Sequence, residues 1–219
     1  MALDRRLSTI ASRLAAVYGV PRRRREDPLG SLIATVLSQN TSDVNSGRAY
    51  RSLRTAFPSW SALAAAAPRG IERAIRHGGL ARIKSRRIHE LLRALKRREG
   101  RYDLRVLCRL PAAEAEARLS GLPGVGPKTR ACVLLFACGH PAFPVDTHVR
   151  RIAGRLGLVG PRVSAAAAHA ILGPAVPEGR HLELHLNLIR LGRELCRARA
   201  PRCPACPLRA LCDHGRRAA

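Results

Sequence analysis

Aromatic residues are scarce in this sequence of 219 residues, and no long apolar segment occurs. With 3 Phe, 3 Tyr and 1 Trp, the core must be built from Ala, Leu, Ile and Val, which suits closely packed helices. No apolar segment reaches the roughly 20 residues of a membrane-spanning helix. The charged N-terminus, with Asp4, Arg5, Arg6 and Arg13, excludes the hydrophobic region of a signal peptide. The sequence therefore predicts a soluble, intracellular protein.

Acidic residues are also few: 15 Asp and Glu stand against 40 Lys and Arg, a net charge of +25. The excess is spread along the whole chain, so the surface repels itself unless an anionic partner neutralises it. Nucleic acid is the first candidate for that partner and an acidic membrane the second. A hydrophobic fraction of 46% excludes wholesale disorder.

Hydrophobic periodicity predicts an almost entirely helical chain, and no strand is expected. Residues 30–38 are apolar on nearly all sides, as in a central buried helix. Residues 81–99 are expected to form a long basic helix that ends at Gly100 and turns Ile83 inward. Asp43 is expected to cap a helix over 43–57 or to act as a pocket acid, Ser59 to cap a short helix, and Pro68 to open another. The remaining expected helices are 4–18, 111–119, 128–138, 147–156, 164–172 and 181–194.

A glycine-rich turn lies between two of these helices, in the segment 119–130 with the sequence LSGLPGVGPKTR. Its glycines permit a tight turn and close approach of a ligand, and its amides precede a helix N-terminus. A DNA phosphate is the natural anion for such a basic chain. An ordinary helix–turn–helix connection without a ligand is the alternative.

Lysine is nearly absent: Lys84, Lys96 and Lys128 are the only three, against 37 Arg. Lys128 lies just inside the helix after the turn. A neutral amine can attack a sugar C1′ and form a Schiff base, whereas a guanidinium cannot. A phosphate-binding or plain surface lysine is the alternative interpretation.

Four of the seven cysteines cluster at Cys196, Cys203, Cys206 and Cys212, in the spacing C-x6-C-x2-C-x5-C. Four thiolates are the ligand set of a [4Fe–4S] cluster and also a possible zinc set, although zinc ribbons usually have two separated C-x2-C pairs. Disulfides are a third possibility. The remaining three fall on apolar helical positions and are expected to be buried thiols; they are Cys108, Cys132 and Cys138.

The segment LPGVGPKT, the motif Val145-Asp146-Thr147-His148 and the cysteine spacing occur in the order seen in endonuclease III-like DNA glycosylases, and the chain resembles that helix–hairpin–helix family over about residues 28–212. The resemblance implies that Lys128 is the nucleophile, that Asp146 is the catalytic carboxylate and that the four C-terminal cysteines hold a [4Fe–4S] cluster. Asp146 is also a routine helix cap, and both roles can coexist. It further implies DNA contacts from the hairpin and from His148, which could instead lie on the helix surface. The hairpin contacts would come from Leu122, Gly124, Val125, Gly126 and Thr129.

Two loops resemble the segments with which this family fills the hole left by an extruded base. Residues 37–43, LSQNTSD, align with the family's LSAQATD, so the usual Gln falls at Asn40, or at Gln39 if the backbone shifts by one. Residues 79–84, GLARIK, resemble GLYNSK, which makes Leu80 an apolar wedge or else a core residue. Lys84 is interpreted as a phosphate contact or a structural ion pair.

We therefore expect an all-α, two-lobed glycosylase fold. Residues 30–140 would form a six-helix barrel lobe with the hairpin, while 1–29 and 141–219 would form the cluster lobe, with DNA in the groove between them. The implied function is removal of oxidised pyrimidines from damaged duplex DNA, followed by a 3′ cut at the abasic site by β-elimination. A monofunctional uracil or thymine mismatch glycosylase and a non-catalytic DNA-binding or redox-sensing protein are the alternatives. A monomer in a bacterial cytoplasm, associated with the nucleoid and not with membranes, is expected.

Overall fold

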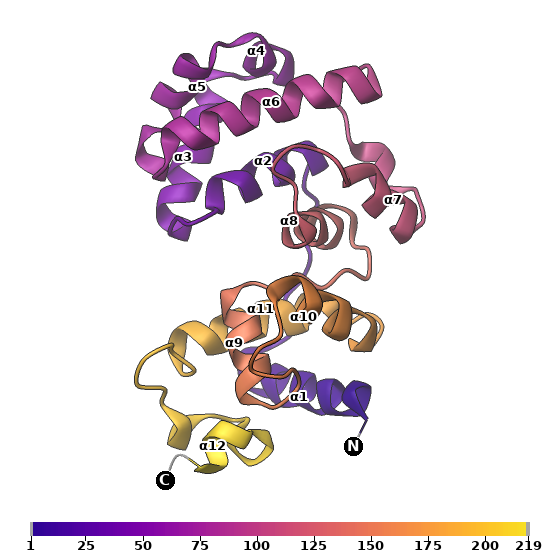
Figure 1. Ribbon diagram of the computed structural model, residues 1–219, viewed down its shortest axis with the longest axis vertical. Coiled ribbons are helices and arrows are strands. Elements are labelled where there is room, and N and C mark those ends of the chain that lie inside the picture. The colour runs from indigo at the N-terminus through magenta and orange to yellow at the C-terminus, as the bar shows by residue number, and fades with distance from the viewer. Residues whose placement is uncertain (1, 218–219) are drawn as a thin grey trace. The chain divides into compact units, whose positions relative to one another are not determined.

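The chain splits into two compact units in the computed structural model, which describes residues 2–217 (Figure 1). Residues 25–140 form one, which we call the hairpin unit. Residues up to 24 and from 141 onward form the other, which we call the terminal unit. Within residues 2–217 every regular element is helical, and none of these helices has the length and apolarity needed to cross a bilayer.

The hairpin unit is built around one apolar helix, α2 (Pro28–Ser38), as expected. Side chains on all its sides are buried, Leu32, Ile33 and Leu37 completely. Complete burial of each such side chain contributes about 1.5–3 kcal/mol to folding. The other elements of this unit are α3 (Asp43–Ala56), α4 (Trp60–Ala65), α5 (Pro68–Ala74), η1 (Arg76–Gly78), α6 (Ala81–Glu99), η2 (Arg105–Cys108), α7 (Ala112–Leu119), α8 (Pro127–Cys132) and the π-helical η3 (Val133–Cys138). Of these, α3, α6, η2, α8 and η3 contact α2.

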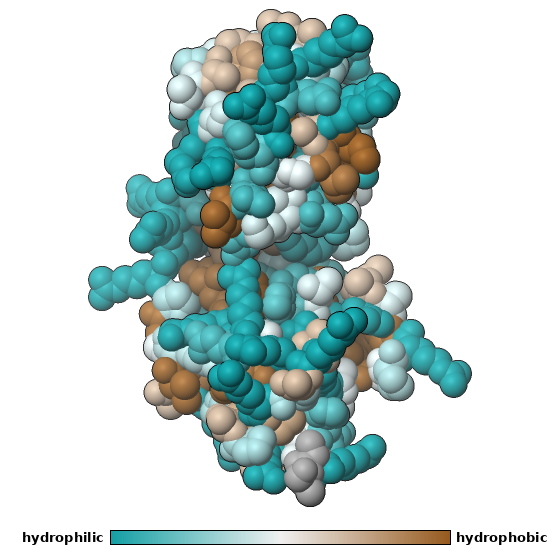
Figure 2. Space-filling model, turned by 90° about the vertical axis from the view of Figure 1, so that its left-hand side faces the viewer, coloured by the Kyte–Doolittle hydropathy of each residue, from teal (hydrophilic) through white to brown (hydrophobic). Residues whose placement is uncertain are grey.

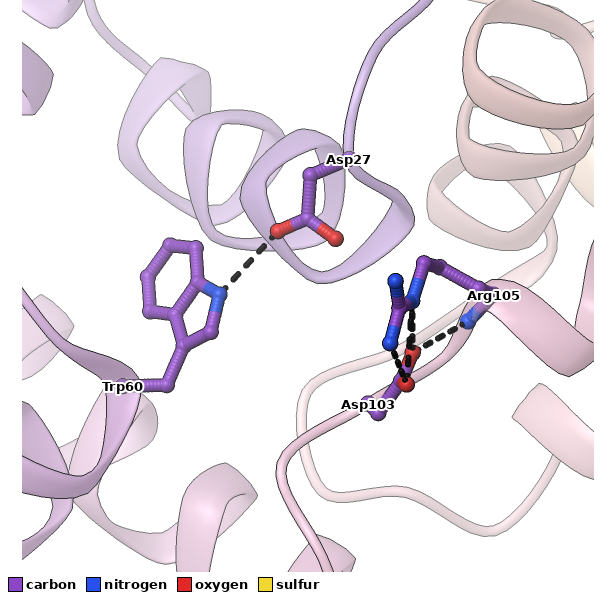
Figure 3. Close-up of polar contacts among 4 residues, drawn as sticks. All are labelled: Asp27, Trp60, Asp103 and Arg105. Carbon is purple, nitrogen blue, oxygen red and sulfur yellow. Dashed lines mark hydrogen bonds and ion pairs between the residues drawn. The ribbon is translucent and has the colours of Figure 1, made fainter.

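The N-terminus of α2 is fixed by Asp27 (Figure 3). One carboxylate oxygen, Oδ2, accepts from the Gly30 amide at 2.9 Å and from the Trp60 indole Nε1 at 3.1 Å. The guanidinium of Arg54 stacks 4.0 Å from the centre of the Trp60 ring. Asp27 therefore ties the central helix to α4. In the same view, the Arg105 guanidinium and amide hold the pKa of Asp103 down at about 2.

Helix boundaries follow the local signals at three predicted positions and depart from them at one. Ser59 caps α4 by accepting from the Ala62 amide at 3.0 Å, Pro68 opens α5, and Gly100 ends α6 with φ +68°. The prediction that Asp43 caps α3 is wrong. Ser42 is the cap, accepting from the Asn45 amide, and Asp43 is the first helical residue, where a carboxylate favours the positive end of the helix dipole.

Gly78 lies where α3 and η1 meet, and this contact has no room for a side chain. A Cβ at Gly78 would stand 2.8 Å from the Cβ of Ala49, which the α3 backbone holds rigidly. We expect Gly78→Ala to lower the free energy of unfolding by about 1–3 kcal/mol through overpacking. Gly70→Ala is the control, because its Cβ would make only an ordinary 3.9 Å contact with Phe57. Urea denaturation of both variants measures the difference, and equal stabilities would contradict the packing described.

The terminal unit brings the N-terminal helix against the C-terminal third of the chain. Helix α11 (His181–Glu194) contacts both α1 (Leu3–Tyr18) and α9 (Thr147–Arg155). The core between them includes Leu7, Leu14, Ile152, Leu184 and Leu188. The remaining elements are α10 (Ala165–Leu172), η4 (Gly173–Ala175), η5 (Cys203–Ala205), η6 (Arg209–Leu211) and α12 (Asp213–Arg217).

Candidate active site and nucleic-acid interface

A tight turn joins α7 to α8 in the hairpin unit. Gly121 and Gly124 have φ values of +78° and +75°, which a residue with a side chain adopts only with strain. The Val125 amide donates to the Leu122 carbonyl at 3.1 Å and closes the turn. Arg130 braces the two helices, since its Nε donates to Glu116 of α7 at 3.2 Å and its Nη1 to the Val125 carbonyl at 3.4 Å. Sequence reasoning missed this brace.

The N-terminus of α8 is left open by the chain itself. Gly126 occupies the cap position without a side-chain cap, and a Cβ built on it would meet no atom within 4 Å. The amides of Lys128 and Thr129 lie in the first turn, where a helix offers no intrahelical acceptor. Together with the helix dipole, these donors suit an anion such as a phosphate.

The side chains of the hairpin divide into buried and exposed groups. Leu122, Val125 and Thr129 are buried, at 4%, 7% and 4% exposure. Their side chains pack into the hairpin unit, so the predicted DNA contacts of these three residues remain a prediction for their backbone atoms. Gly124 and Gly126 are exposed.

Lys128 is half-exposed at the start of α8, one residue after Pro127. The part of the chain that the structure describes gives its ammonium no ion-pair partner. Its amine is thus available to a ligand at the open helix end.

Asp146 caps α9 in the terminal unit. Its Oδ1 accepts from the Val149 amide at 2.7 Å, and the preceding amide, that of Val145, donates to His169 Nε2 at 2.9 Å. The cap bond holds the carboxylate against the N-terminus of α9 and leaves the residue half-exposed. Within residues 2–217 the second oxygen, Oδ2, has no hydrogen-bond partner.

His148 faces the interior of its own unit on one side. Its Nδ1 lies 3.1 Å from Arg151 Nη2, and a Cβ on Gly192 would lie 2.6 Å from this nitrogen. Arg151 also donates to the carbonyls of Gly192 and Cys196, at 2.9 and 2.8 Å. The ring therefore helps to pack α9 on α11.

The two loops expected to enter the duplex both carry a non-glycine residue in the left-handed region. Asn40 has φ +51° and is exposed, whereas the Gln39 side chain accepts from Arg87 Nη1 at 2.9 Å. Leu80 has φ +52° and is 50% exposed, so it is not a core residue. Ile83, predicted to point inward, is 48% exposed, whereas the next residue, Lys84, is the one that points into the core.

The prediction that Lys84 contacts a phosphate or forms a structural ion pair is wrong. Its side chain is 1% exposed, so it cannot reach a phosphate, and it bonds to oxygens that carry no charge. Nζ donates to the carbonyls of Leu37 and Gly78, at 2.6 and 2.9 Å, and to the Thr41 hydroxyl. Burial lowers the pKa of this amine.

The four C-terminal cysteines line one pocket of the terminal unit, and none of them is in a disulfide. Burial raises the pKa of the Cys206 thiol, and Cys196, Cys212 and Cys203 raise it further. Arg155 donates to Cys196 Sγ at 3.2 Å and the Gly215 amide to Cys212 Sγ at 3.3 Å.

Four thiols that line one pocket are the ligand set of a [4Fe–4S] cluster and also a possible zinc set. The N–H donors to sulfur, from Arg155 and Gly215, are suited to tuning a cluster held there.

The other three cysteines do not all match the expectation of buried thiols. Cys132 is buried and is not in a disulfide, but Cys108 and Cys138 form one, and Cys108 is exposed. The pair meets because η2 packs on η3. The disulfide closes a 30-residue separation that includes the whole hairpin.

The surface around these features is strongly hydrophilic. The face drawn in Figure 2 is covered mostly by long hydrophilic side chains (teal), with separate hydrophobic patches between them. The 40 basic residues outnumber the 15 acidic residues by 25, so the net charge is strongly positive whatever the fold. The excess positive charge remains for an anionic polymer.

Comparison with known proteins identifies the class. Residues 33–176 match the family HhH-GPD, the HhH-GPD superfamily of base excision DNA repair proteins. The chain is 36% identical over 198 residues to endonuclease III of Thermotoga maritima, covering 90% of this chain and 88% of that protein. It therefore belongs to this superfamily and is endonuclease III-like, as the resemblance implied.

Two further comparisons bear on fold and length. The fold matches that of a trapped endonuclease III–DNA covalent intermediate, an estranged-adenine complex, with a TM-score of 0.85, 29% identity and 99% of each chain covered. The predicted all-α, two-lobed fold class is thereby confirmed. An Arabidopsis thaliana protein, provisionally assigned as a DNA glycosylase, is 40% identical over 168 residues, 77% of this chain, and the match spans 57% of its length.

Proposed function

We propose that the chain is a bifunctional DNA glycosylase and abasic-site lyase that removes oxidised pyrimidines from duplex DNA. The observation that carries the proposal is the open N-terminus of α8, where Lys128 is half-exposed, has no ion-pair partner among residues 2–217 and lies beside Gly126, which has no side chain to cap the helix. Family membership supports it, because a base excision repair protein must act on a damaged nucleotide.

The amine of Lys128 supplies the nucleophile. Its Nζ attacks C1′ of the damaged nucleotide, the glycosidic bond breaks, and the base leaves with the bonding electron pair and takes up a proton. Ring opening then gives a Schiff base between Nζ and C1′. Loss of a proton from C2′ expels the 3′ phosphate, which is the β-elimination step. An arginine could bind the same phosphates but could not form the imine.

The carboxylate of Asp146 stabilises the positive charge that develops at C1′ as the base departs. Its Oδ1 is fixed by the Val149 amide, so the group is oriented before substrate binds. Oδ2 remains for the sugar or for a proton of the attacking amine.

The duplex is held through phosphates and through the hole left by the flipped base. Backbone amides of the hairpin bind a phosphate at the start of α8. Asn40 and Leu80 enter the duplex, because both side chains are exposed on left-handed backbone. Gln39 is the weaker candidate of the first loop, since Arg87 holds its side chain.

The four C-terminal cysteines hold a [4Fe–4S] cluster, which would supply a covalent cross-link that orders the segment 196–212. This segment has little apolar core of its own, and Leu208 is its one side chain in the core of the terminal unit. The cysteines and the donors on Arg155 and Gly215 keep the basic loop in place.

We expect Cys206→Ser to reduce iron from about four atoms per chain to less than about one. Residues 197–211 should then become the first site of protease cleavage, because metal binding and folding of the loop are coupled. Iron and sulfide analysis, visible absorption and limited proteolysis measure the effect. Cys132→Ala is the matched control and should keep its iron. Zinc in place of iron in the purified wild type would contradict the cluster.

A substrate panel tests the activity. Duplexes with thymine glycol, dihydrouracil, uracil opposite guanine, an abasic site or no damage are incubated with enzyme, and base release and strand cleavage are followed separately. The proposal expects release of the two oxidised pyrimidines with cleavage at the same rate. Release of uracil without cleavage would favour a monofunctional mismatch enzyme. Tight binding to all duplexes without release would favour a non-catalytic protein.

A further inference from the structure

A buried lysine without a carboxylate partner joins two loops of the hairpin unit. Lys84 donates from Nζ to the Leu37 carbonyl at the end of α2, to the Thr41 hydroxyl and to the Gly78 carbonyl. The Thr41 hydroxyl in turn donates to Gly78 at 2.7 Å. Three ammonium protons thus meet three oxygens, which are drawn from two segments separated by more than 35 residues.

These bonded segments directly flank two exposed non-glycine residues of the hairpin unit that have left-handed backbone. Asn40 lies between Leu37 and Thr41, and Leu80 follows Gly78 by two residues. Non-glycine residues keep such a backbone only where their surroundings determine it. Gly79 has φ +63°, and a Cβ built on it would lie 3.4 Å from the Thr41 hydroxyl oxygen. The two segments are therefore in close contact at this glycine.

The side chain at position 84 must be a long, straight cation for this arrangement. A methionine would fill the same space, but the Leu37 carbonyl would lose its bond to Nζ and the Gly78 carbonyl would keep only the Thr41 hydroxyl as a donor. The amine reaches them from α6, which follows the exposed Leu80 and carries the exposed Ile83 in its first turn. Its next turn carries Arg87, which holds Gln39 and lies 3.7 Å, at its Cδ, from the Cβ position of Gly124.

We propose that Lys84 is a positioning residue, a buried clasp that holds loops 38–42 and 78–81 together so that Asn40 and Leu80 enter the duplex as one unit. The inference rests on the proposed function and deepens it. Lys84 touches neither substrate nor the reacting atoms. It promotes base extrusion indirectly, by holding the two loops in place.

Loss of the clasp should therefore affect substrates unequally. A damaged base within a duplex must be extruded and its place filled, so excision depends on both loops. An abasic site in single-stranded DNA has no base to extrude and no hole to fill. Reaction of Lys128 with it requires the hairpin unit to be folded but does not require the loops to be aligned.

The variants separate the clasp from general stability. Thr41→Val removes the hydroxyl that joins Lys84 to Gly78 and keeps the side-chain shape, while Thr41→Ser keeps the hydroxyl and is its matched control. Lys84→Met removes all three donors. Leu91→Ala, a completely buried change farther along α6, controls for lost stability alone. Melting temperatures are measured for every variant.

Three readouts are compared: single-turnover base release from a damaged duplex, borohydride trapping on single-stranded abasic DNA, and hydrogen exchange of residues 38–42 and 78–81. For Thr41→Val and Lys84→Met we expect base release to fall about 10- to 100-fold, as for small misplacements of binding groups. Trapping should change less than about threefold on the same argument. Exchange should accelerate in both loops. Thr41→Ser should behave as the wild type.

Two results would overturn the inference. One is an equal loss in release and trapping that parallels the melting temperature, as Leu91→Ala should give. The other is unchanged exchange in the two loops of Lys84→Met. If wild-type protein neither releases bases nor becomes trapped, the proposed function has failed, and faster exchange would then establish the clasp as a purely structural one.

Discussion

Lys128→Arg should lose strand cleavage and base excision by at least about 1000-fold, as expected when a covalent nucleophile is removed. The guanidinium keeps the positive charge at the start of α8 but cannot attack C1′ or form an imine. DNA affinity should therefore change little, because phosphate binding depends on charge and on the backbone amides of the hairpin. Single-turnover kinetics on a thymine glycol duplex and a binding titration at fixed salt measure the two quantities.

The scarcity of lysine makes the control unusually clean. Lys96 is exposed near the end of α6, where its Nζ donates to the Gly100 carbonyl at 2.7 Å. Lys96→Arg should retain full activity. Lys84 is buried and cannot replace Lys128 as a nucleophile. Cleavage that persists in Lys128→Arg would mean that the attacking amine lies elsewhere, such as the N-terminal amine.

Asp146→Asn should lower base excision by about 100- to 1000-fold with little loss of stability. An amide is a good helix cap and can still accept from the Val149 amide, so α9 keeps its start. It cannot stabilise the positive charge at C1′ as a carboxylate does, and losses of this size are typical for such electrostatic groups. Single-turnover base release and thermal unfolding are the measurements.

Asp146→Ala separates the two roles of this residue. It should lose the same activity and about 1 kcal/mol of stability as well, because the cap is gone. Equal activities of Asp146→Asn and wild type would show that Asp146 is only a helix cap.

Local chemistry explains what the sequence could predict of the fold. Ser59, Pro68 and Gly100 mark helix ends through interactions within a few residues, and the continuous apolar stretch of α2 could belong only to a buried helix. The choice between Ser42 and Asp43 as a cap was missed, because both residue types can cap and only the backbone angles decide.

Long-range contacts explain what the sequence could not predict. The partner of Lys84 on α2, Leu37, is 47 residues away, and no periodicity in the sequence indicates a buried ammonium. Cys108 and Cys138 were interpreted one by one as apolar positions, whereas their pairing depends on the packing of η2 on η3. Nothing in the sequence sets Arg87 apart from the other arginines, of which the chain has 37 in all, and its role follows only from its contact with Gln39.

In the candidate site, too, the sequence indicates the residues that a local motif requires but not the contacts that depend on the fold. The sequence motifs indicated Lys128, Asp146 and the four cysteines, because each motif needs one particular residue type. The motifs did not distinguish backbone from side-chain contacts in the hairpin, where Leu122, Val125 and Thr129 are buried. The proposal prefers Asn40 to Gln39 because of the Arg87 contact and the backbone of Asn40, neither of which the motif indicates.

The measurement that tests the central claim most directly is borohydride trapping of wild-type protein on a damaged duplex, followed by peptide mapping of the adduct by mass spectrometry. The account predicts one covalent DNA–protein product per reaction, with the sugar remnant on the peptide that contains Lys128. Base release without a trapped product, or a remnant on any other amine, would contradict it.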